Sequence, residues 1–211
     1  YVLFGSRSGF PTAFDLTTLN GSNGFTIPGV AANGGLGWSV SSAGDINSDN
    51  VTDLVLGAPD ANSSLGVSYV LFGSRSGFPA VFNLTTLNGS NGFTIPGIEI
   101  SGGLGHSVSS AGDINGDNIT DLVLGALFAN SNLGVSYVLF GSRSGFPAVF
   151  NLTTLNGSNG FTIPGIEAGG YLGGSVSGAG DINGDNVTDL VLGGDDANSY
   201  LGVSYVLFGS R

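Results

Sequence analysis

The chain has 211 residues, of which 41% are apolar and 9% are charged, with 39 glycines and no cysteine or methionine. This apolar content excludes a disordered chain, and the irregular glycine spacing excludes collagen. The net charge is −11 and the only basic side chains are four arginines, so no basic patch for nucleic acid can form. No run of about 20 apolar residues is present, so we expect no membrane insertion.

The chain repeats itself every 68 residues. The heptad Tyr-Val-Leu-Phe-Gly-Ser-Arg begins at Tyr1, Tyr69, Tyr137 and Tyr205. Segments 69–136 and 137–204 are identical at 58 of 68 positions. Self-similarity at a fixed period of this size is typical of solenoids and propellers. Since the chain has no Met and starts and stops inside the same heptad, we expect it to be a segment of a longer array.

Within the period that begins at Leu36, short apolar segments alternate with turns. Residues 37–43 are small and alternate loosely, and residues 54–56 are wholly apolar, as in a strand buried on both faces. Residues 67–72 are rich in β-branched and aromatic side chains. Residues 82–87 and 93–95, on either side of the turn 88–92, are expected to hold the fourth strand. Four short strands per unit, with no helical period, predict an all-β fold of tandem four-stranded β-propeller-type blades.

Each period contains one loop that is rich in Asp and Asn. The loops span residues 45–53, 113–121 and 181–189, and each reads D-x-N-x-D-N-(V/I)-T-D. Positions 1, 3, 5 and 9 carry side-chain oxygens, and position 7 can offer a backbone carbonyl. Calcium takes six to eight such oxygens, whereas magnesium keeps its waters. The candidate metal ligands are Asp45, Asn47, Asp49, Val51, Asp53, Asp113, Asn115, Asp117, Ile119, Asp121, Asp181, Asn183, Asp185, Val187 and Asp189.

The loops differ from an EF-hand. Position 12 of the first loop is Leu56, where an EF-hand has a bidentate Glu, and position 6 is Asn50 instead of Gly. Asn tolerates the left-handed conformation that such a turn needs. The other interpretation is a turn that closes a hairpin without a metal. Nine of the 15 acidic residues lie in the three loops, and without a cation they would repel one another, so we expect one Ca²⁺ per loop.

These segments resemble the FG-GAP repeat, the blade unit of integrin α-subunit propellers and of related bacterial surface proteins, over the whole chain. The family pattern is a Phe-Gly-type start, a D-x-D/N-x-D-G-x-x-D loop, and then Asp-Leu-x-x-Gly-Ala-Pro. Here Leu36-Gly37 stands in place of Phe-Gly, and Gly-Ala-Pro is kept only at 57–59. The resemblance implies that the loop joins the first two strands of a blade and that its Asp and Asn side chains are the calcium ligands. It also implies an extracellular location, secreted or at the cell surface.

Family phasing divides the chain into four parts. Residues 1–34 would hold the last strands of one blade, 35–102 and 103–170 would be complete blades, and 171–211 would hold the first strands of another. Rings of this family usually have seven blades, so three arrangements remain open: a fragment of a larger closed propeller, a ring shared by several chains, or an open stacked array that forms a filament. Exposed strand edges at the ends of the array predict self-association.

The sequence contains nine N-x-S/T sequons. Abundant Asn, Ser and Thr in turns would explain them without any glycan, and a glycan-decorated surface is the functional interpretation. Asn50, Asn118 and Asn186 lie inside the calcium loops and are less suitable acceptors. The candidate glycosylation sites are Asn20, Asn83, Asn88, Asn151 and Asn156.

The leading functional hypothesis is a calcium-binding repeat protein with a structural and adhesive role. The alternative is a recognition propeller that binds a protein or glycan ligand on one face, because differences between copies cluster at 100–106, 126–128 and 132. No enzyme is predicted, since His106 is the only histidine and no nucleophile–His–acid set exists. The arginines are expected to pair with backbone or carboxylate groups at the seam between blades.

Overall fold

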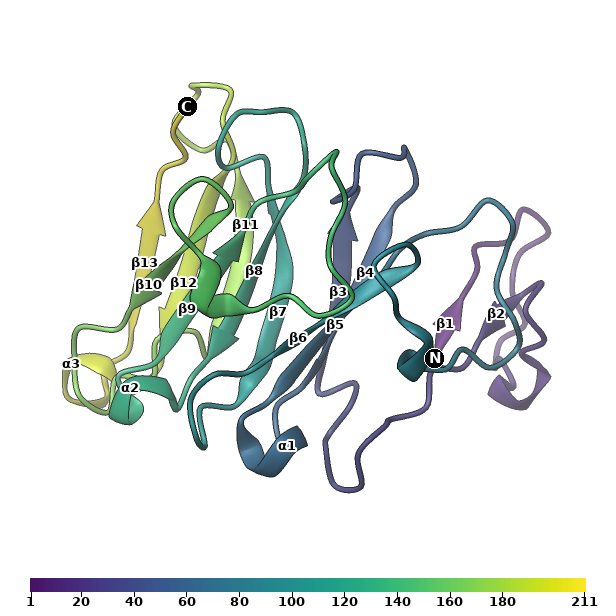
Figure 1. Ribbon diagram of the computed structural model, residues 1–211, viewed down its shortest axis with the longest axis horizontal. Coiled ribbons are helices and arrows are strands. Elements are labelled where there is room, and N and C mark those ends of the chain that lie inside the picture. The colour runs from purple at the N-terminus through teal and green to yellow at the C-terminus, as the bar shows by residue number, and fades with distance from the viewer.

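The structure is a computed structural model that describes residues 1–211, and it contains four antiparallel β-sheets (Figure 1). The prediction of an all-β fold with four-stranded sheets is confirmed. The N-terminal sheet pairs β1 (Val2–Leu3) with β2 (Gly24–Phe25). The next has the order β3 (Ser39–Gly44), β4 (Asp53–Ala58), β5 (Val67–Leu71), β6 (Gly92–Pro96). The third has β7 (Leu104–Gly112), β8 (Asp121–Ala126), β9 (Val135–Leu139), β10 (Gly160–Pro164), and the last has β11 (Ser175–Gly180), β12 (Asp189–Gly194), β13 (Val203–Leu207).

The apolar core lies between neighbouring sheets. In the largest cluster, Val55 of one sheet and Ile46 of its Asp-rich loop pack with Leu122 and Leu124 of the next sheet, and all four are buried. The central strands β5 and β9 are buried along their whole length, as expected for strands covered on both faces. Burial of these side chains is the main term that holds sheet to sheet.

Glycines bring the backbones of neighbouring sheets into direct contact. Gly57 of β4 faces Gly105 of β7, and a Cβ atom added to Gly57 would overlap the Gly105 carbonyl oxygen. Gly125 faces Gly173 in the same way at the next junction. The hydroxyl of Ser39 donates a hydrogen bond of 2.8 Å to the Gly105 carbonyl. The equivalent hydrogen bond, from the Ser107 hydroxyl to the Gly173 carbonyl, is 2.7 Å long. The two junctions are therefore built from the same contacts.

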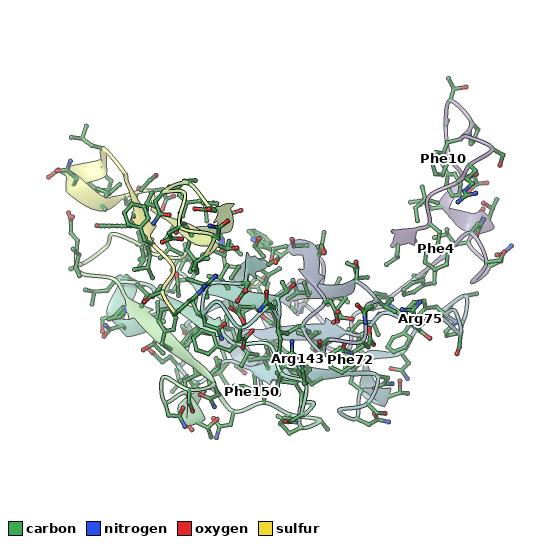
Figure 2. All side chains as sticks on the ribbon, turned by 90° about the horizontal axis from the view of Figure 1, so that it is seen from above. Phe4, Phe10, Phe72, Arg75, Arg143 and Phe150 are labelled. Atoms are coloured by element: carbon green, nitrogen blue, oxygen red, sulfur yellow. The ribbon has the colours of Figure 1, made fainter.

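The sheets form a curved row. Seen from above, the two ends of the row turn toward the same side, with Phe4 and Phe10 in the arm that rises at the N-terminal end (Figure 2). The first strand of the third sheet, β7, contacts the first strands of the sheets on either side of it, β3 and β11. None of the helical segments is long and apolar enough to cross a membrane.

One strand prediction is wrong. Residues 82–87 do not extend the fourth strand, because Leu84–Thr86 forms a 3-10 turn (η2), repeated as η1 (Leu16–Thr18) and η3 (Leu152–Thr154). The side chain of Asn83 accepts a 3.0 Å hydrogen bond from the Thr85 amide and thereby caps the turn. Asn side chains commonly compete with regular pairing through such local bonds. The fourth strand is therefore limited to β6, after the turn at 88–92.

The connections between the second and third strands are also unusual. They contain the short segments α1 (Ala61–Ser64), α2 (Ala129–Asn132) and α3 (Ala197–Tyr200), which lie along the lower edge in Figure 1. Each contains residues with left-handed backbone angles, as at Asn130 with φ 54° and Ser131 with φ 57°. Such angles are strained for Ser131, whereas Asn tolerates them. These turns lie at the end of each sheet opposite to the Asp-rich loops, since consecutive strands are antiparallel.

Candidate metal-binding loops

Each Asp-rich loop connects the first and second strands of a sheet. Loop 45–53 joins β3 to β4, loop 113–121 joins β7 to β8, and loop 181–189 joins β11 to β12. The hairpin register shifts just before each loop, at Ser42/Gly44 in the first copy. Gly44 has φ 67° there, a conformation that glycine adopts without steric cost. The bulge turns the chain away from the ladder, so the loop projects from the end of the sheet.

The last aspartate of each loop is fully buried and ties the loop to its sheet. In the first loop, the Asp53 carboxylate accepts hydrogen bonds from the amides of Ile46 at 3.0 Å and Gly73 at 2.8 Å. In the second loop, Asp121 accepts from Ile114 and Gly141 over the same distances. In the third, the corresponding bonds are 2.8 and 3.0 Å. One carboxylate thus joins the start of the loop to the second residue after the third strand.

Burial raises the pKa of two of these carboxyls. It raises the pKa of Asp53 to about 6, against the opposing effect of its two backbone hydrogen bonds and with a contribution from the charges of Asp49 and Asp45. It raises the pKa of Asp121 to about 7 for the same reasons. At the exposed first position of the third loop the balance is reversed. There, backbone hydrogen bonds, the Asn186 amide foremost, lower the pKa of Asp181.

The aspartates and asparagine at positions 1, 3 and 5 organise the turn itself. In the first loop, the two Asp45 carboxylate oxygens accept from the amides of Asp49 and Asn50, both at 2.9 Å. Asn47 accepts from the Asp49 amide, and Asp49 accepts from the Val51 amide at 2.8 Å. The second and third loops contain the same bonds. Three separate sequences thus fold into one hydrogen-bonded form.

The left-handed conformation expected at position 6 is confirmed. The φ angles are 61° at Asn50, 64° at Asn118 and 65° at Asn186. Position 4 is left-handed as well, with φ 62° at Ser48, and the later copies place glycine there. The sequence already carried this second signal, in the Ser-to-Gly difference between the first loop and the others.

The donor set has the chemistry that calcium requires, but the structure does not gather it around one point. No three Asp, Glu or His groups lie close enough together to hold a metal ion. Every carboxylate oxygen of the first loop accepts a hydrogen bond from within the chain. A carboxylate oxygen has more than one lone pair, so a hydrogen bond does not exclude a cation. The ligand assignment therefore remains a prediction.

Arg75 binds the first loop. Its Nη2 donates to the backbone carbonyl of Asn50 at 3.0 Å and, more weakly, to that of Asp49 at 3.4 Å. The expected backbone partner of Arg75 is present, but it belongs to the same sheet and not to the seam between sheets. The side chain of Arg211, in contrast, lies beside Gly116 in the loop of the neighbouring sheet, which is the expected location. The Arg75 bond links the end of the third strand to the carbonyl side of the loop.

The five candidate glycosylation sites are all exposed. Asn88 accepts hydrogen bonds from the amide and hydroxyl of Ser90 through its side-chain oxygen, and Asn156 does the same with Ser158. In each case the oxygen is engaged, whereas the side-chain nitrogen, to which a glycan would be attached, has no bond within the chain. The local geometry leaves the acceptor atoms accessible.

A contact at the opposite end of the sheets was not expected from the sequence. The Glu99 carboxylate accepts a hydrogen bond from the Asn130 amide at 2.6 Å and so holds the left-handed turn α2. Glu167 holds α3 through Asn198 in the same way. The first copy has Ala31 at this position. The sequence signal for this contact was a single Glu that recurs at the same position in two of the three copies.

Comparisons with known proteins agree with the repeat pattern. The FG-GAP repeat family model matches residues 36–71 and 104–139. The chain is 34% identical over 166 residues to phosphatidylinositol-glycan-specific phospholipase D of Bos taurus, which covers 75% of this chain and 18% of that protein. It is 30% identical over 160 residues to integrin alpha-2 of Bos taurus, covering 74% and 13%. The chain thus spans less than a fifth of the length of these relatives.

Proposed function

This chain is an FG-GAP repeat protein, and we propose that it is a calcium-stabilised structural and adhesive module that acts outside the cell. The observation that supports the proposal is the common form of the three Asp-rich loops, each ending in a buried aspartate. Nine acidic residues are concentrated in these loops, and the loop segments themselves contain no basic residue, although Arg75 donates to backbone carbonyls of the first loop. A calcium ion bound to each loop would offset that charge and couple metal binding to folding.

The proposed ligands are the oxygen-bearing residues of each loop, with a carbonyl at position 7. In the middle loop these are Asp113, Asn115, Asp117, the carbonyl of Ile119, and Asp121. Calorimetric titration of the metal-free chain with calcium chloride should give three ions per chain. Asp113→Ala should give two, because the first ligand of one loop is lost, and Asp195→Ala should leave three. An unchanged stoichiometry for Asp113→Ala would refute the ligand assignment.

Self-association through the end faces is part of the proposal. It is supported by the junction between sheets, which is built twice within the chain from the same parts. On the last sheet, Gly193 has only Ser175 near its Cβ position, whereas its equivalent Gly125 packs on Gly173. On the first complete sheet, nothing lies within 4 Å of the Cβ position of Gly37. Gly193 of one copy and Gly37 of a second copy could therefore pack on each other, as Gly125 and Gly173 do within the chain.

Strand pairing indicates which of the two terminal heptads would be displaced from the sheet in such a complex. Residues 1–7 and 205–211 are the same heptad and would compete for one place in the shared sheet. β13 pairs with β12 over five residues, whereas β1 pairs with β2 over two, so the N-terminal heptad is the weaker competitor. Exposed strand edges favour such additions.

Sedimentation velocity over a range of concentrations tests self-association. Gly193→Val should abolish it, because the side chain would occupy the place of the second copy, while within the chain its Cβ would meet only Ser175, at 3.5 Å. Ile100→Ala, which introduces the residue of the third copy at a site far from both ends, should not change it. A concentration-independent monomer for the unaltered chain would overturn this part of the proposal. Negative-stain images would then distinguish closed rings from filaments.

An enzymatic role is not part of the proposal. One relative is named as a phospholipase D, but this chain covers only 18% of that protein. The second candidate function is recognition of a ligand. It is favoured by one observation: the copies differ mainly around a single groove between two sheets.

A further inference from the structure

A groove of about 790 Å³ lies between the two complete sheets, at the end opposite to the Asp-rich loops. Its walls come from the start of β3 and of β7, from turns α1 and α2, and from the segment after β6. The volume is in the range of small-molecule sites in proteins. The left-handed turns contribute Ser64, Asn130, Ser131 and Asn132 to the lining.

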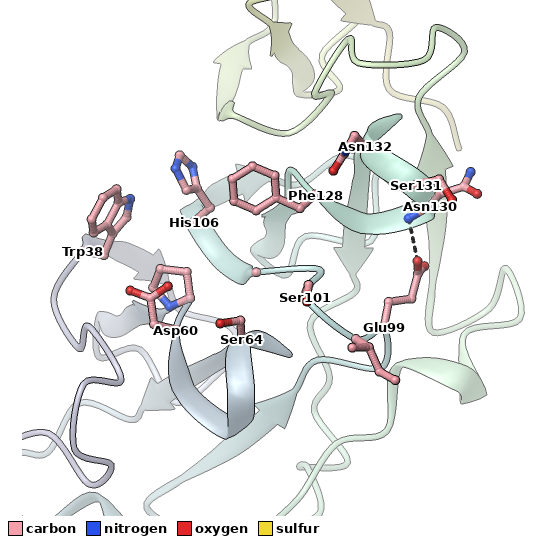
Figure 3. A pocket seen from close by; sticks show the side chains of 13 residues that line it. Trp38, Asp60, Ser64, Glu99, Ser101, His106, Phe128, Asn130, Ser131 and Asn132 are labelled. Atoms are coloured by element: carbon pink, nitrogen blue, oxygen red, sulfur yellow. Dashed lines mark hydrogen bonds between the residues drawn. The ribbon is translucent and has the colours of Figure 1, made fainter.

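Three rings stand in a row along the groove: Trp38, His106 and Phe128 (Figure 3). The rings of Trp38 and His106 have centroids 5.5 Å apart. Trp38 is 61% exposed and Phe128 is 48% exposed, whereas Phe72, Phe93 and Phe150 are buried in the core between the sheets. The row therefore presents flat apolar faces to solvent.

Polar groups face this row. Asp60 and Ser64 lie below the rings, and Asn132 lies beyond Phe128 (Figure 3). Glu99 is already engaged by the Asn130 amide, so Asp60 is the carboxylate that remains free. No lysine or arginine lines the groove. The Nδ1 atom of His106 is buried and has no hydrogen-bond partner, which is costly unless a ligand or water satisfies it.

The repeat comparison singles out the same residues. Segment 69–136 contributes nine residues to the groove, and six of them differ from their equivalents in segment 137–204. Among the other 59 positions, only four differ. The equivalents of Trp38 are His106 and Gly174, and the equivalents of Asp60 are Phe128 and Asp196. The combination of rings and polar groups therefore occurs once in this chain, although the framework around it is repeated.

We propose that this groove binds a neutral saccharide of one to a few sugar rings. This inference rests on the recognition candidate above and is independent of calcium. Sugar rings have flat faces of C–H groups that pack on aromatic rings, and hydroxyls that bond to carboxylate, amide and hydroxyl side chains. A groove without a basic side chain does not suit an anion. With a single free carboxylate beside several amides and hydroxyls, it suits a polyol better than a cation.

Trp38 makes the test direct, because it is the only tryptophan of the chain. Its fluorescence should change saturably, with one site per chain, on titration with at least one member of a panel of methyl glycosides (glucose, galactose, mannose, fucose and N-acetylglucosamine). Phe128→Asp and His106→Gly, which introduce the residues of the third copy, should weaken that binding about tenfold or more. Tyr200→Ser, which introduces the residue of the first copy outside the groove, should leave it unchanged.

The failures of this inference can be distinguished from those of the proposed function. Thermal unfolding shows whether each variant is folded, and calcium titration shows whether it binds calcium. No fluorescence change with any glycoside, in a chain that binds calcium normally, would overturn the saccharide site alone. Saturable binding of N-acetyl-arginine amide that Asp60→Asn abolishes would instead show a cation site and would also overturn it. Glycoside binding by a chain that takes up no calcium would sustain this inference and refute the calcium proposal.

Discussion

Gly57 and Gly105 lie backbone to backbone, so that the carbonyl of one occupies the place of a side chain on the other. This contact allows the second strand of one sheet to approach the first strand of the next within the reach of the Ser39 hydroxyl. The close approach in turn lets the aliphatic side chains beside it interlock across the junction. A single pair of glycines thereby sets the spacing between two sheets.

Gly57→Ala should destabilise the chain by about 1–3 kcal/mol, because the new methyl group overlaps a backbone carbonyl that cannot move without separating the sheets. Gly193→Ala is the matched control. It has the same Val-Leu-Gly context, but its Cβ would meet only Ser175, at 3.5 Å. Urea unfolding followed by tryptophan fluorescence measures both. Equal losses in the two variants would show that glycine acts here through the unfolded chain and not through the junction.

Asp121→Ala should destabilise the middle sheet even in the absence of metal. The carboxylate is buried and accepts from the amides of Ile114 and Gly141, so its removal leaves two donors without partners. A buried donor left unsatisfied costs about 1–3 kcal/mol. The unfolding free energy of the calcium-free variant, compared with that of Asp195→Ala at an exposed position, gives the value. A loss no larger than that of the control would refute this structural role.

Removal of calcium should lower the melting temperature. A ligand that binds only the folded chain stabilises it by about 2.7 kcal/mol per site when its free concentration is roughly 100 times the Kd. Differential scanning calorimetry with calcium and with excess chelator measures the difference in melting temperature. Magnesium in place of calcium should restore a smaller part of that difference. The same melting temperature with calcium, with chelator and with magnesium would show that calcium does not stabilise the folded chain.

Glycosylation should favour the turns that precede the fourth strand over the Asp-rich loops. Asn88 and Asn156 are exposed with a free side-chain nitrogen, whereas Asn118 is left-handed at the tip of a loop. Mass spectrometry of glycopeptides from the chain secreted by a glycosylating host should find sugar at the first two. A glycan at Asn118 with none at Asn156 would contradict this prediction. An Asn156→Gln variant serves as the control that assigns the glycopeptide.

Several features could be predicted from residues alone because their causes are local. The spacing of Asp45, Asn47, Asp49 and Asp53 determined a loop, since each side chain bonds to an amide a few residues away. The left-handed asparagine at position 6 follows from the same short-range chemistry. The error at 82–87 was local too. There the capping ability of Asn83 outweighed a β-rich composition.

The features that the sequence could not specify depend on residues far apart in the chain. The sequence by itself determined the 68-residue unit, its strands and its acidic loops, because propensity, turn chemistry and repetition act over a few residues. Only the tertiary structure decided that Gly57 meets Gly105, and that Trp38, Asp60, His106 and Phe128 surround one groove. Packing of whole sheets brings these residues together across 48 and up to 90 positions of the chain, and that packing is set by burial of the faces between them.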